Sequence, residues 1–241
     1  MGKFVILIYG VISYLIFLLT FLYAIGFMGN LLVPKSIDSG ADGPLLNALL
    51  INVVLLSIFA VQHSVMARPA FKAWWTNIIP KAAERSTYVL LSSLALILLF
   101  YYWQPMGGII WQVEGSIGQA ILYSLFGFGW ALVLVSTFLI NHFDLFGLRQ
   151  VYLNFTGKEY TALKFGTPGP YKLIRHPLYL GWFFAFWATP TMTVAHLAFA
   201  IITTVYILLA IRWEEQDLVT ALGEDYANYR KTVPMIIPFI K

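Results

Sequence analysis

Four long apolar stretches constrain the fold of this chain more than any other feature of its sequence. They cover residues 4–27, 45–66, 87–103 and 117–140. Each is close to the length of about 20 residues at which a helix crosses a hydrocarbon layer of about 30 Å. The chain is also 60% hydrophobic and only 11% charged, whereas soluble domains carry roughly 25% charged residues. The sequence therefore predicts an all-α integral membrane protein.

A fifth apolar region, residues 178–212, is too long for one crossing and is interrupted by Thr189-Pro190-Thr191. This pattern predicts a helical hairpin with a short arm over 178–188 and a longer arm over 194–211. We expect four long transmembrane helices followed by this C-terminal hairpin. The polar tail 213–241 completes a single domain that covers the whole chain, 1–241.

Lysines and arginines are distributed unevenly between the connections. The loops 67–86 and 142–177 and the tail are basic, whereas the loops 28–44 and 104–116 contain Lys35 as their one basic residue. The positive-inside rule therefore places the basic loops and both termini in the cytoplasm. The net charge of +4 is a sign of topology, and it does not indicate a nucleic-acid partner.

Cysteine content, the loop 67–86 and the tail give three further constraints. The chain has no cysteine, which excludes disulfides, thiolate metal sites, cysteine nucleophiles and covalent haem attachment. The loop 67–86 combines Trp74 and Trp75 with cations and two prolines, which is typical of a segment at the membrane surface. In the tail, Tyr226 and Tyr229 lie at helical spacing and predict a short amphipathic helix.

Charged residues lie at both ends of the hairpin. The short arm opens with Arg175-His176-Pro177, and Pro177 suits the first position of a helix, where a missing N–H costs nothing. The unpaired N–H groups of a helix start beside an arginine favour a carboxylate or a phosphate. Gly181 removes a side chain one turn later and would let a flat ring approach the backbone.

The long arm returns Arg212, Glu214 and Glu215 to the same depth. Arg212 and Glu215 are three residues apart and share a helix face, so we favour Glu215 as the glutamate that faces a ligand. The simpler interpretation is that Arg175 and His176 anchor the chain among lipid headgroups and that the two glutamates form an ordinary charge cluster at the membrane exit.

The segment Arg175-His176-Pro177-Leu178-Tyr179-Leu180-Gly181, with Glu214-Glu215 downstream, resembles the signature of integral membrane methyltransferases that use S-adenosylmethionine (SAM). These include isoprenylcysteine carboxyl methyltransferases and phospholipid N-methyltransferases. The runs 141–151, 62–68 and 233–235 are similar to those of the bacterial methanethiol S-methyltransferases, which convert methanethiol to dimethyl sulfide. The resemblance covers nearly the whole chain.

The resemblance implies a cytoplasmic active site in a multi-pass protein of the bacterial inner membrane. Its expected partners are a small volatile thiol, SAM as co-substrate and membrane lipid, with no metal, no nucleic acid and no obligate protein partner. The residues expected to bind SAM are Tyr171, Arg175, His176, Tyr179, Gly181, Arg212, Glu214 and Glu215.

Methyl transfer to a thiol needs orientation and a proton acceptor, because the thiolate is the nucleophile. We expect His142 or Tyr88 to accept the proton, with Asn141 and Asp144 beside them. Asp144 could orient the His142 ring, or it could form a structural bridge to Arg149. The histidines themselves could be buried groups bonded to their neighbours.

Three other functions remain open from the sequence. A methyltransferase of this kind could act on a prenyl or phospholipid acceptor. A haem- or quinone-binding subunit could use His63 and His142 as ligands. A membrane reductase of the sterol type shares the Arg-His-Pro signature, but the chain lacks a nicotinamide-binding fingerprint.

Overall fold

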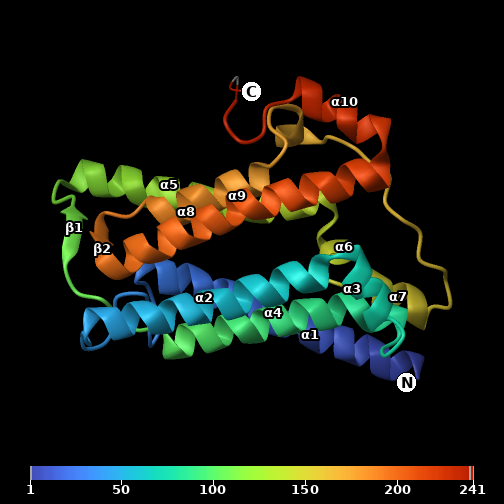
Figure 1. Ribbon diagram of the computed structural model, residues 1–241, viewed down its shortest axis with the longest axis horizontal. Helices are drawn as coiled ribbons and strands as arrows, with labels where there is room; N and C mark the ends of the chain where they lie inside the picture. The colour runs from blue at the N-terminus through green and yellow to red at the C-terminus, as the bar shows by residue number, and fades with distance from the viewer. Residues whose placement is uncertain (1, 239, 241) are drawn as a thin grey trace. The chain divides into compact units, whose positions relative to one another are not determined.

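A computed structural model describes residues 2–238 and 240. Within this part of the chain, the structure has five helices long and apolar enough to cross a membrane (Figure 1). They are α1 (Lys3–Gly29), α2 (Leu45–Ala67), α4 (Lys81–Tyr102), α5 (Ser116–Ile140) and α9 (Val194–Leu222). The prediction of an all-α membrane protein is confirmed.

Shorter elements connect and follow these five helices. They are α3 (Pro69–Trp75), β1 (Ile109–Gln112), α6 (His142–Leu145), α7 (Leu148–Phe155), the 3-10 turn η1 (Gly169–Lys172), α8 (Pro177–Trp187), β2 (Thr191–Thr193) and α10 (Glu224–Thr232). By its internal contacts the chain divides into two compact units. Unit 1 comprises Met1–Gly107 and Asn141–Ala162, and unit 2 comprises Gly108–Ile140 and Leu163–Lys241. The single domain expected from the sequence stays a prediction.

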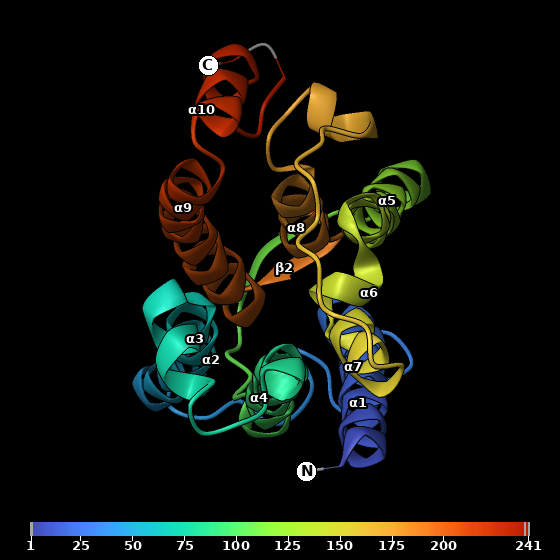
Figure 2. The same ribbon diagram turned by 90° about the vertical axis from the view of Figure 1, so that its right-hand side faces the viewer.

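In unit 1, α4 packs against both α1 and α2 and lies between them (Figure 2). The short helix α7 packs along α1, where Ile6, Ala83 and Val151 form a buried cluster. A Cβ atom on Gly10 of α1 would lie 2.6 Å from Val151 Cγ2, so this glycine allows α7 to approach α1 closely.

In unit 2, the short helix α8 packs against α5 along most of its length and also contacts α9. Two glycines meet where α5 and α8 touch. A Cβ atom on Gly181 would lie 2.8 Å from the Gly129 carbonyl oxygen, and a Cβ atom on Gly129 would lie 2.6 Å from the Ala185 nitrogen. Small residues at such a contact let two membrane helices approach through their backbones.

The predicted hairpin is present as α8 and α9, and its turn contains structure that the sequence did not indicate. Strand β2 in this turn pairs antiparallel with β1, with Ile109 opposite Thr193. The indole of Trp111 also donates a hydrogen bond to the Thr189 carbonyl oxygen, at 3.1 Å. The loop 104–116 therefore binds the turn of the hairpin through backbone and side-chain hydrogen bonds.

Two helices extend beyond their predicted bounds by more than one turn. Helix α4 begins at Lys81 rather than 87, because the polar segment after Pro80 is rich in good helix formers. Helix α9 continues to Leu222, eleven residues past the predicted end of the apolar arm at 211, and so includes the charged residues. It ends at Gly223, whose φ of +63° suits glycine, and the short tail helix predicted around Tyr226 follows as α10.

Candidate active site

The entry to α8 has the geometry that its sequence predicts. Pro177 occupies the first turn of the helix and His176 precedes it as the N-cap. The tail supplies two hydrogen bonds to this entry: the Arg175 amide donates to the Pro234 carbonyl oxygen at 2.9 Å, and the His176 amide donates to the Met235 carbonyl oxygen at 3.1 Å. Residues 234 and 235 therefore fix the backbone that carries Arg175 and His176.

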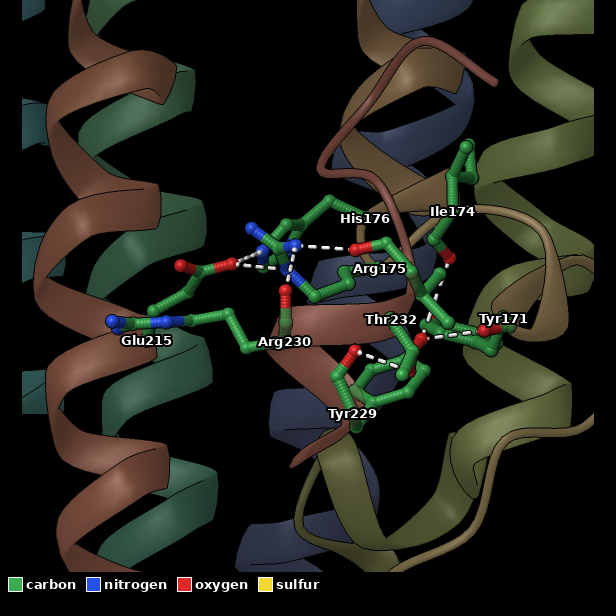
Figure 3. A network of polar contacts seen from close by, with 9 residues as sticks. Tyr171, Ile174, Arg175, His176, Glu215, Tyr229, Arg230 and Thr232 are labelled. Atoms are coloured by element: carbon green, nitrogen blue, oxygen red, sulfur yellow. Dashed lines mark hydrogen bonds and ion pairs between the residues drawn. The ribbon is translucent and has the colours of Figure 1, made fainter. Parts of the chain in front are cut away.

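Glu215 is the centre of a buried charge cluster (Figure 3). Arg175 Nε donates to Glu215 Oε1 at 2.7 Å, and His176 Nε2 lies 3.0 Å from the same oxygen. The side chains of Arg175 and Glu215 are each only 10% exposed. Arg175 Nη1 also donates to the carbonyl oxygens of Arg230 and Val233. Glu215 thus joins α9 to the start of α8, and Arg175 joins both to α10.

Glu214 has different surroundings from its neighbour. It is half-buried, and its Oε2 atom accepts a hydrogen bond of 2.8 Å from the Tyr179 hydroxyl. Adjacent positions on a helix are about 100° apart, so the two carboxylates point in different directions. Arg212 is exposed, although it shares a face of α9 with the buried Glu215.

Three tyrosines of unit 2 lie near enough to the glutamate pair to feel its charge. Burial raises the pKa of Tyr226, and the negative charges of Glu215 and Glu214 raise this pKa further. Burial likewise raises the pKa of Tyr229 to about 12, where the nearby Arg175 opposes the shift. Tyr229 donates its proton to the Tyr171 carbonyl oxygen, and its phenol holds this proton throughout the physiological range.

Tyr171 brings a hydroxyl group into the same region. Burial raises the pKa of Tyr171 well above its usual value, and the charge of Glu214 raises this pKa further. The Tyr171 hydroxyl and the Ser136 hydroxyl of α5 are buried and interact with each other, and neither has a further partner within the described part of the chain. Because this interaction lacks good hydrogen-bond geometry, a ligand with polar groups would be stabilised here.

Gly181 has a packing function in this unit. The space that its side chain would fill is occupied by Gly129 and Val133 of α5. Gly181 therefore sets the distance between α5 and α8. Its predicted contact with a flat ring stays a prediction.

Unit 2 thus gathers a guanidinium, an imidazole, two carboxylates and phenol groups within one local structure. Such a set suits a small ligand that carries both signs of charge, because each sign finds an opposite partner and polar atoms remain for its hydroxyl groups. Among residues 2–238 and 240, no group of three or more His, Cys, Asp or Glu side chains has the spacing to hold a metal ion.

The residues expected to accept the thiol proton lie in unit 1, where two tyrosine–histidine pairs occur. His142 Nε2 lies 2.9 Å from the Tyr14 hydroxyl, and burial lowers the pKa of His142. The Tyr88 hydroxyl lies 2.8 Å from His63 Nε2 and 3.0 Å from His63 Nδ1. A phenol thus lies beside Nε2 of His142 and beside both ring nitrogens of His63.

Asn141 and Asp144 shape the turn that presents His142. The Asn141 side-chain oxygen accepts a hydrogen bond of 3.1 Å from the Asp144 amide and so caps α6. Asp144 accepts hydrogen bonds from Arg149 at 2.8 Å and from Tyr160 at 3.2 Å. Of the two interpretations of Asp144, the structural bridge to Arg149 is the one that the structure contains.

The sequence did not single out several residues that complete these clusters. Tyr14 is a tyrosine within an apolar stretch, and Ser136 is a serine in another, so neither stands out by composition. The spacing of Tyr226 and Tyr229 in the tail predicted a helix, but it did not predict that these side chains lie near Glu215. The supporting carbonyl groups of residues 230–235 belong to the backbone, which carries no sequence signal.

Comparison with known proteins gives close relatives over nearly the whole chain. The chain is 65% identical over 235 residues to a Methanethiol S-methyltransferase of Crocosphaera subtropica, covering 98% of this chain and 92% of the relative. It is 53% identical over 239 residues to a Methanethiol S-methyltransferase of Mycobacterium tuberculosis, covering 99% of this chain and 98% of the relative.

A more distant relative is Nurim of Rattus norvegicus, 32% identical over 187 residues that cover 73% of this chain and 70% of the relative. No family model and no solved structure matches the chain. The two relatives named for methanethiol are identical to this chain at more than half of the aligned positions, over nearly its whole length, and the chain belongs to the methanethiol S-methyltransferase family.

Proposed function

We propose that this membrane protein transfers the methyl group of SAM to methanethiol and produces dimethyl sulfide. The observation that carries this proposal is the 65% identity, over 98% of the chain, to a relative that bears the name Methanethiol S-methyltransferase. The charge cluster of unit 2 supports the choice of SAM, because SAM carries a carboxylate, an ammonium, a sulfonium and ribose hydroxyls.

Glu214 is our candidate for the carboxylate that faces SAM. Glu215 already accepts from Arg175 and His176, whereas Glu214 has one hydrogen bond from Tyr179 and the neighbouring hydroxyl of Tyr171. Glu214 would therefore hold the SAM ammonium or the ribose hydroxyls. This assignment differs from the preference for Glu215 that the sequence suggested.

Arg175 is the candidate for the carboxylate of SAM. Its Nε and Nη1 atoms are engaged with Glu215, Arg230 and Val233, and its Nη2 atom has no hydrogen bond within the described residues. A guanidinium held in this way is preorganised, so a ligand carboxylate would find a fixed donor. Tyr171 and Ser136 would supply further hydrogen bonds to polar groups of SAM.

The sulfonium of SAM supplies an electrophilic methyl carbon, and the protein has to place a sulfur lone pair in line with it. A free thiol has a pKa near 8.5, so a residue that accepts its proton raises the thiolate population at neutral pH. His142 is our candidate, because burial lowers its pKa and keeps the ring neutral and able to accept a proton. Tyr88 is the second candidate, and Asn141 positions the turn that carries His142.

The test uses purified protein in detergent with SAM and methanethiol, and it measures dimethyl sulfide in the headspace by gas chromatography. We expect product that depends on protein and on both substrates, and that persists in EDTA because the proposed transfer needs no metal. Absence of product above the protein-free control would end the proposal. A parallel reaction with phospholipid and prenylcysteine acceptors should yield no methylated product.

A further inference from the structure

Unit 1 contains a cavity of about 890 Å³ that none of the proposed chemistry uses. Its wall comes from the end of α3, the first turns of α4, the helices α6 and α7 and the segment 158–160. Of the residues in the proposed thiol chemistry, Asp144 alone contributes to this wall, and its carboxylate is engaged by Arg149 and Tyr160.

The cavity wall includes the polar start of a helix that is long and apolar enough to cross a membrane. Lys81, Glu84 and Arg85 line the cavity, and they belong to the first turns of the membrane-spanning helix α4. The preceding helix α3 carries Trp74, which is 55% exposed, next to Trp75. Indole side chains gather at the level of lipid headgroups. A headgroup would therefore meet this cavity from within its own layer.

Three lysines contribute amines to the cavity wall. Lys81 and Lys158 are exposed and line the wall at the start of α4 and in the segment after α7, and the half-buried Lys72 of α3 lines it as well. The start of α4 adds the N–H groups of Lys81 and Ala82 at a helix N-terminus with no side-chain cap, whereas the Ala83 amide donates to the Pro80 carbonyl oxygen at 2.8 Å. Arg85 contributes less to a ligand, because it donates to the Leu145 carbonyl oxygen at 2.6 Å and lies over the Tyr88 ring. Amines and helix N–H groups together favour a phosphate.

The cavity wall also presents buried acceptors, and Glu84 among them lies one turn after Lys81 on α4. The Oε1 atoms of Glu84 and Gln150 are both buried, and neither has a hydrogen-bond partner within the described residues. The side-chain nitrogen Nδ2 of Asn154, which also lines the wall, is likewise buried and has no hydrogen-bond partner within the described residues. A buried polar atom without a partner costs about 1–3 kcal/mol, so a ligand that donates hydrogen bonds to these oxygens would be stabilised.

We propose that this cavity binds the headgroup of a zwitterionic phospholipid with a primary ammonium, such as phosphatidylethanolamine. Lys81, Lys158 and the start of α4 would hold the phosphate, and Glu84 and Gln150 would accept from the ammonium. A primary ammonium has three N–H donors, whereas the trimethylammonium group of phosphatidylcholine has none. An anionic headgroup without an ammonium would leave Glu84 unpaired. The site goes beyond methyl transfer and does not depend on it.

The test measures lipid binding by native mass spectrometry on the full-length, delipidated protein in detergent. The protein is titrated with phosphatidylethanolamine, phosphatidylcholine and phosphatidylglycerol that carry identical acyl chains. We expect phosphatidylethanolamine to bind about tenfold more tightly than phosphatidylcholine, the factor given by one charge-assisted hydrogen bond to a buried carboxylate. Equal affinities for the two lipids would overturn the proposal.

Two variants separate the two ends of the headgroup. Glu84→Gln should reduce phosphatidylethanolamine binding to the level of phosphatidylcholine, and the double variant Lys81→Gln, Lys158→Gln should weaken all three lipids. The matched controls Glu224→Gln and Lys164→Gln alter exposed charges outside unit 1 and should bind lipid as the wild type does. Unchanged selectivity in Glu84→Gln would also overturn the proposal. If this variant fails to fold, Gln150→Leu provides the same comparison.

A soluble competitor distinguishes the headgroup from the acyl chains. Displacement of the lipid by glycerophosphoethanolamine would mean that the phosphate and ammonium suffice for binding. Failure to displace it, with lipid selectivity intact, would mean that the membrane lipid itself is the ligand. Displacement by glycerophosphocholine to the same extent would contradict the role of the primary ammonium.

Discussion

Single residues in this protein divide between those that hold the structure and those that remain available to a ligand. Glu215 is 8% exposed and shares one oxygen between Arg175 and His176, whereas its neighbour Glu214 is half-buried and bonds only Tyr179 among the contacts described. Because adjacent helix positions point about 100° apart, two neighbouring carboxylates can serve these two purposes.

The first prediction concerns this pair. Glu215→Gln leaves Arg175 and His176 without their carboxylate, and breaking a buried ion pair costs about 3 kcal/mol, so thermal unfolding in detergent should occur at a lower temperature. Glu214→Gln should unfold like the wild type but bind S-adenosylhomocysteine at least tenfold more weakly in calorimetry, since a hydrogen bond to a charged group is worth about 1.5–3 kcal/mol. A Glu214→Gln variant with wild-type affinity would refute the assignment.

The second prediction concerns the pH dependence of stability at His142. Burial lowers the folded-state pKa of His142 below its usual value of about 6.5, so the unfolded chain binds its proton first as the pH falls. The contribution of neutral His142 is therefore complete above pH about 6.5 and decreases below it. His142→Gln should show a flatter loss of stability between pH about 7 and about 5 than the wild type. Parallel denaturation curves at each pH would contradict this.

Secondary-structure elements are positioned by a few close contacts. Helix α8 has only 11 residues, and it is placed by its contact with α5 and by the hydrogen bonds of its first residues to the tail. Short elements of this kind are stable only through such tertiary contacts, because an isolated helix of this length is marginal. The charged entry of α8 therefore depends on Gly181 as much as on Pro177.

The third prediction tests the contact between α5 and α8. Gly181→Ala would bring a Cβ atom to 2.8 Å from the Gly129 carbonyl oxygen, and backbone atoms cannot move aside easily. We expect a loss of about 1–3 kcal/mol in the free energy of unfolding, together with weaker S-adenosylhomocysteine binding. Gly127→Ala is the matched control, since no neighbouring atom lies within 4 Å of the point that its new Cβ atom would occupy, and it should be neutral or slightly stabilising. Equal behaviour of the two variants would argue against the packing explanation.

At the scale of the whole molecule, the candidate residues fall into two groups. The residues proposed to bind SAM lie in unit 2, and those proposed to accept the thiol proton lie in unit 1. Substitutions in the two groups should therefore affect different measurements, SAM affinity for the first and the pH profile of methyl transfer for the second.

The fourth prediction concerns topology. The chain contains no cysteine, so single cysteines introduced at exposed loop positions report their side of the membrane. In intact cells, a membrane-impermeant thiol reagent should label Glu114→Cys and leave Lys164→Cys unlabelled, because the positive-inside rule places the basic loop in the cytoplasm. The reverse labelling would invert the proposed orientation.

Much of the architecture could be predicted from the sequence because it follows from local composition. The apolar lengths gave the helices and the hairpin, and Pro177 gave the start of α8. The strand pair β1–β2 could not be predicted, since its partners lie about 80 residues apart and are too short to have a periodic pattern. For the same reason the tail tyrosines were recognised as helical but not as neighbours of the glutamate pair.

Residue types and their order along the chain were enough to establish that the protein spans a membrane, that it resembles a family of methyltransferases and which charged residues could contribute to the site. Those properties depend on residue type and on spacing along the chain. The packing of the folded chain was needed to learn that Glu215 binds Arg175 and His176, that Gly181 packs against Gly129, and that Asp144 bridges to Arg149. These outcomes depend on which distant segments meet, and a charged residue binds the partner that the fold places nearest to it.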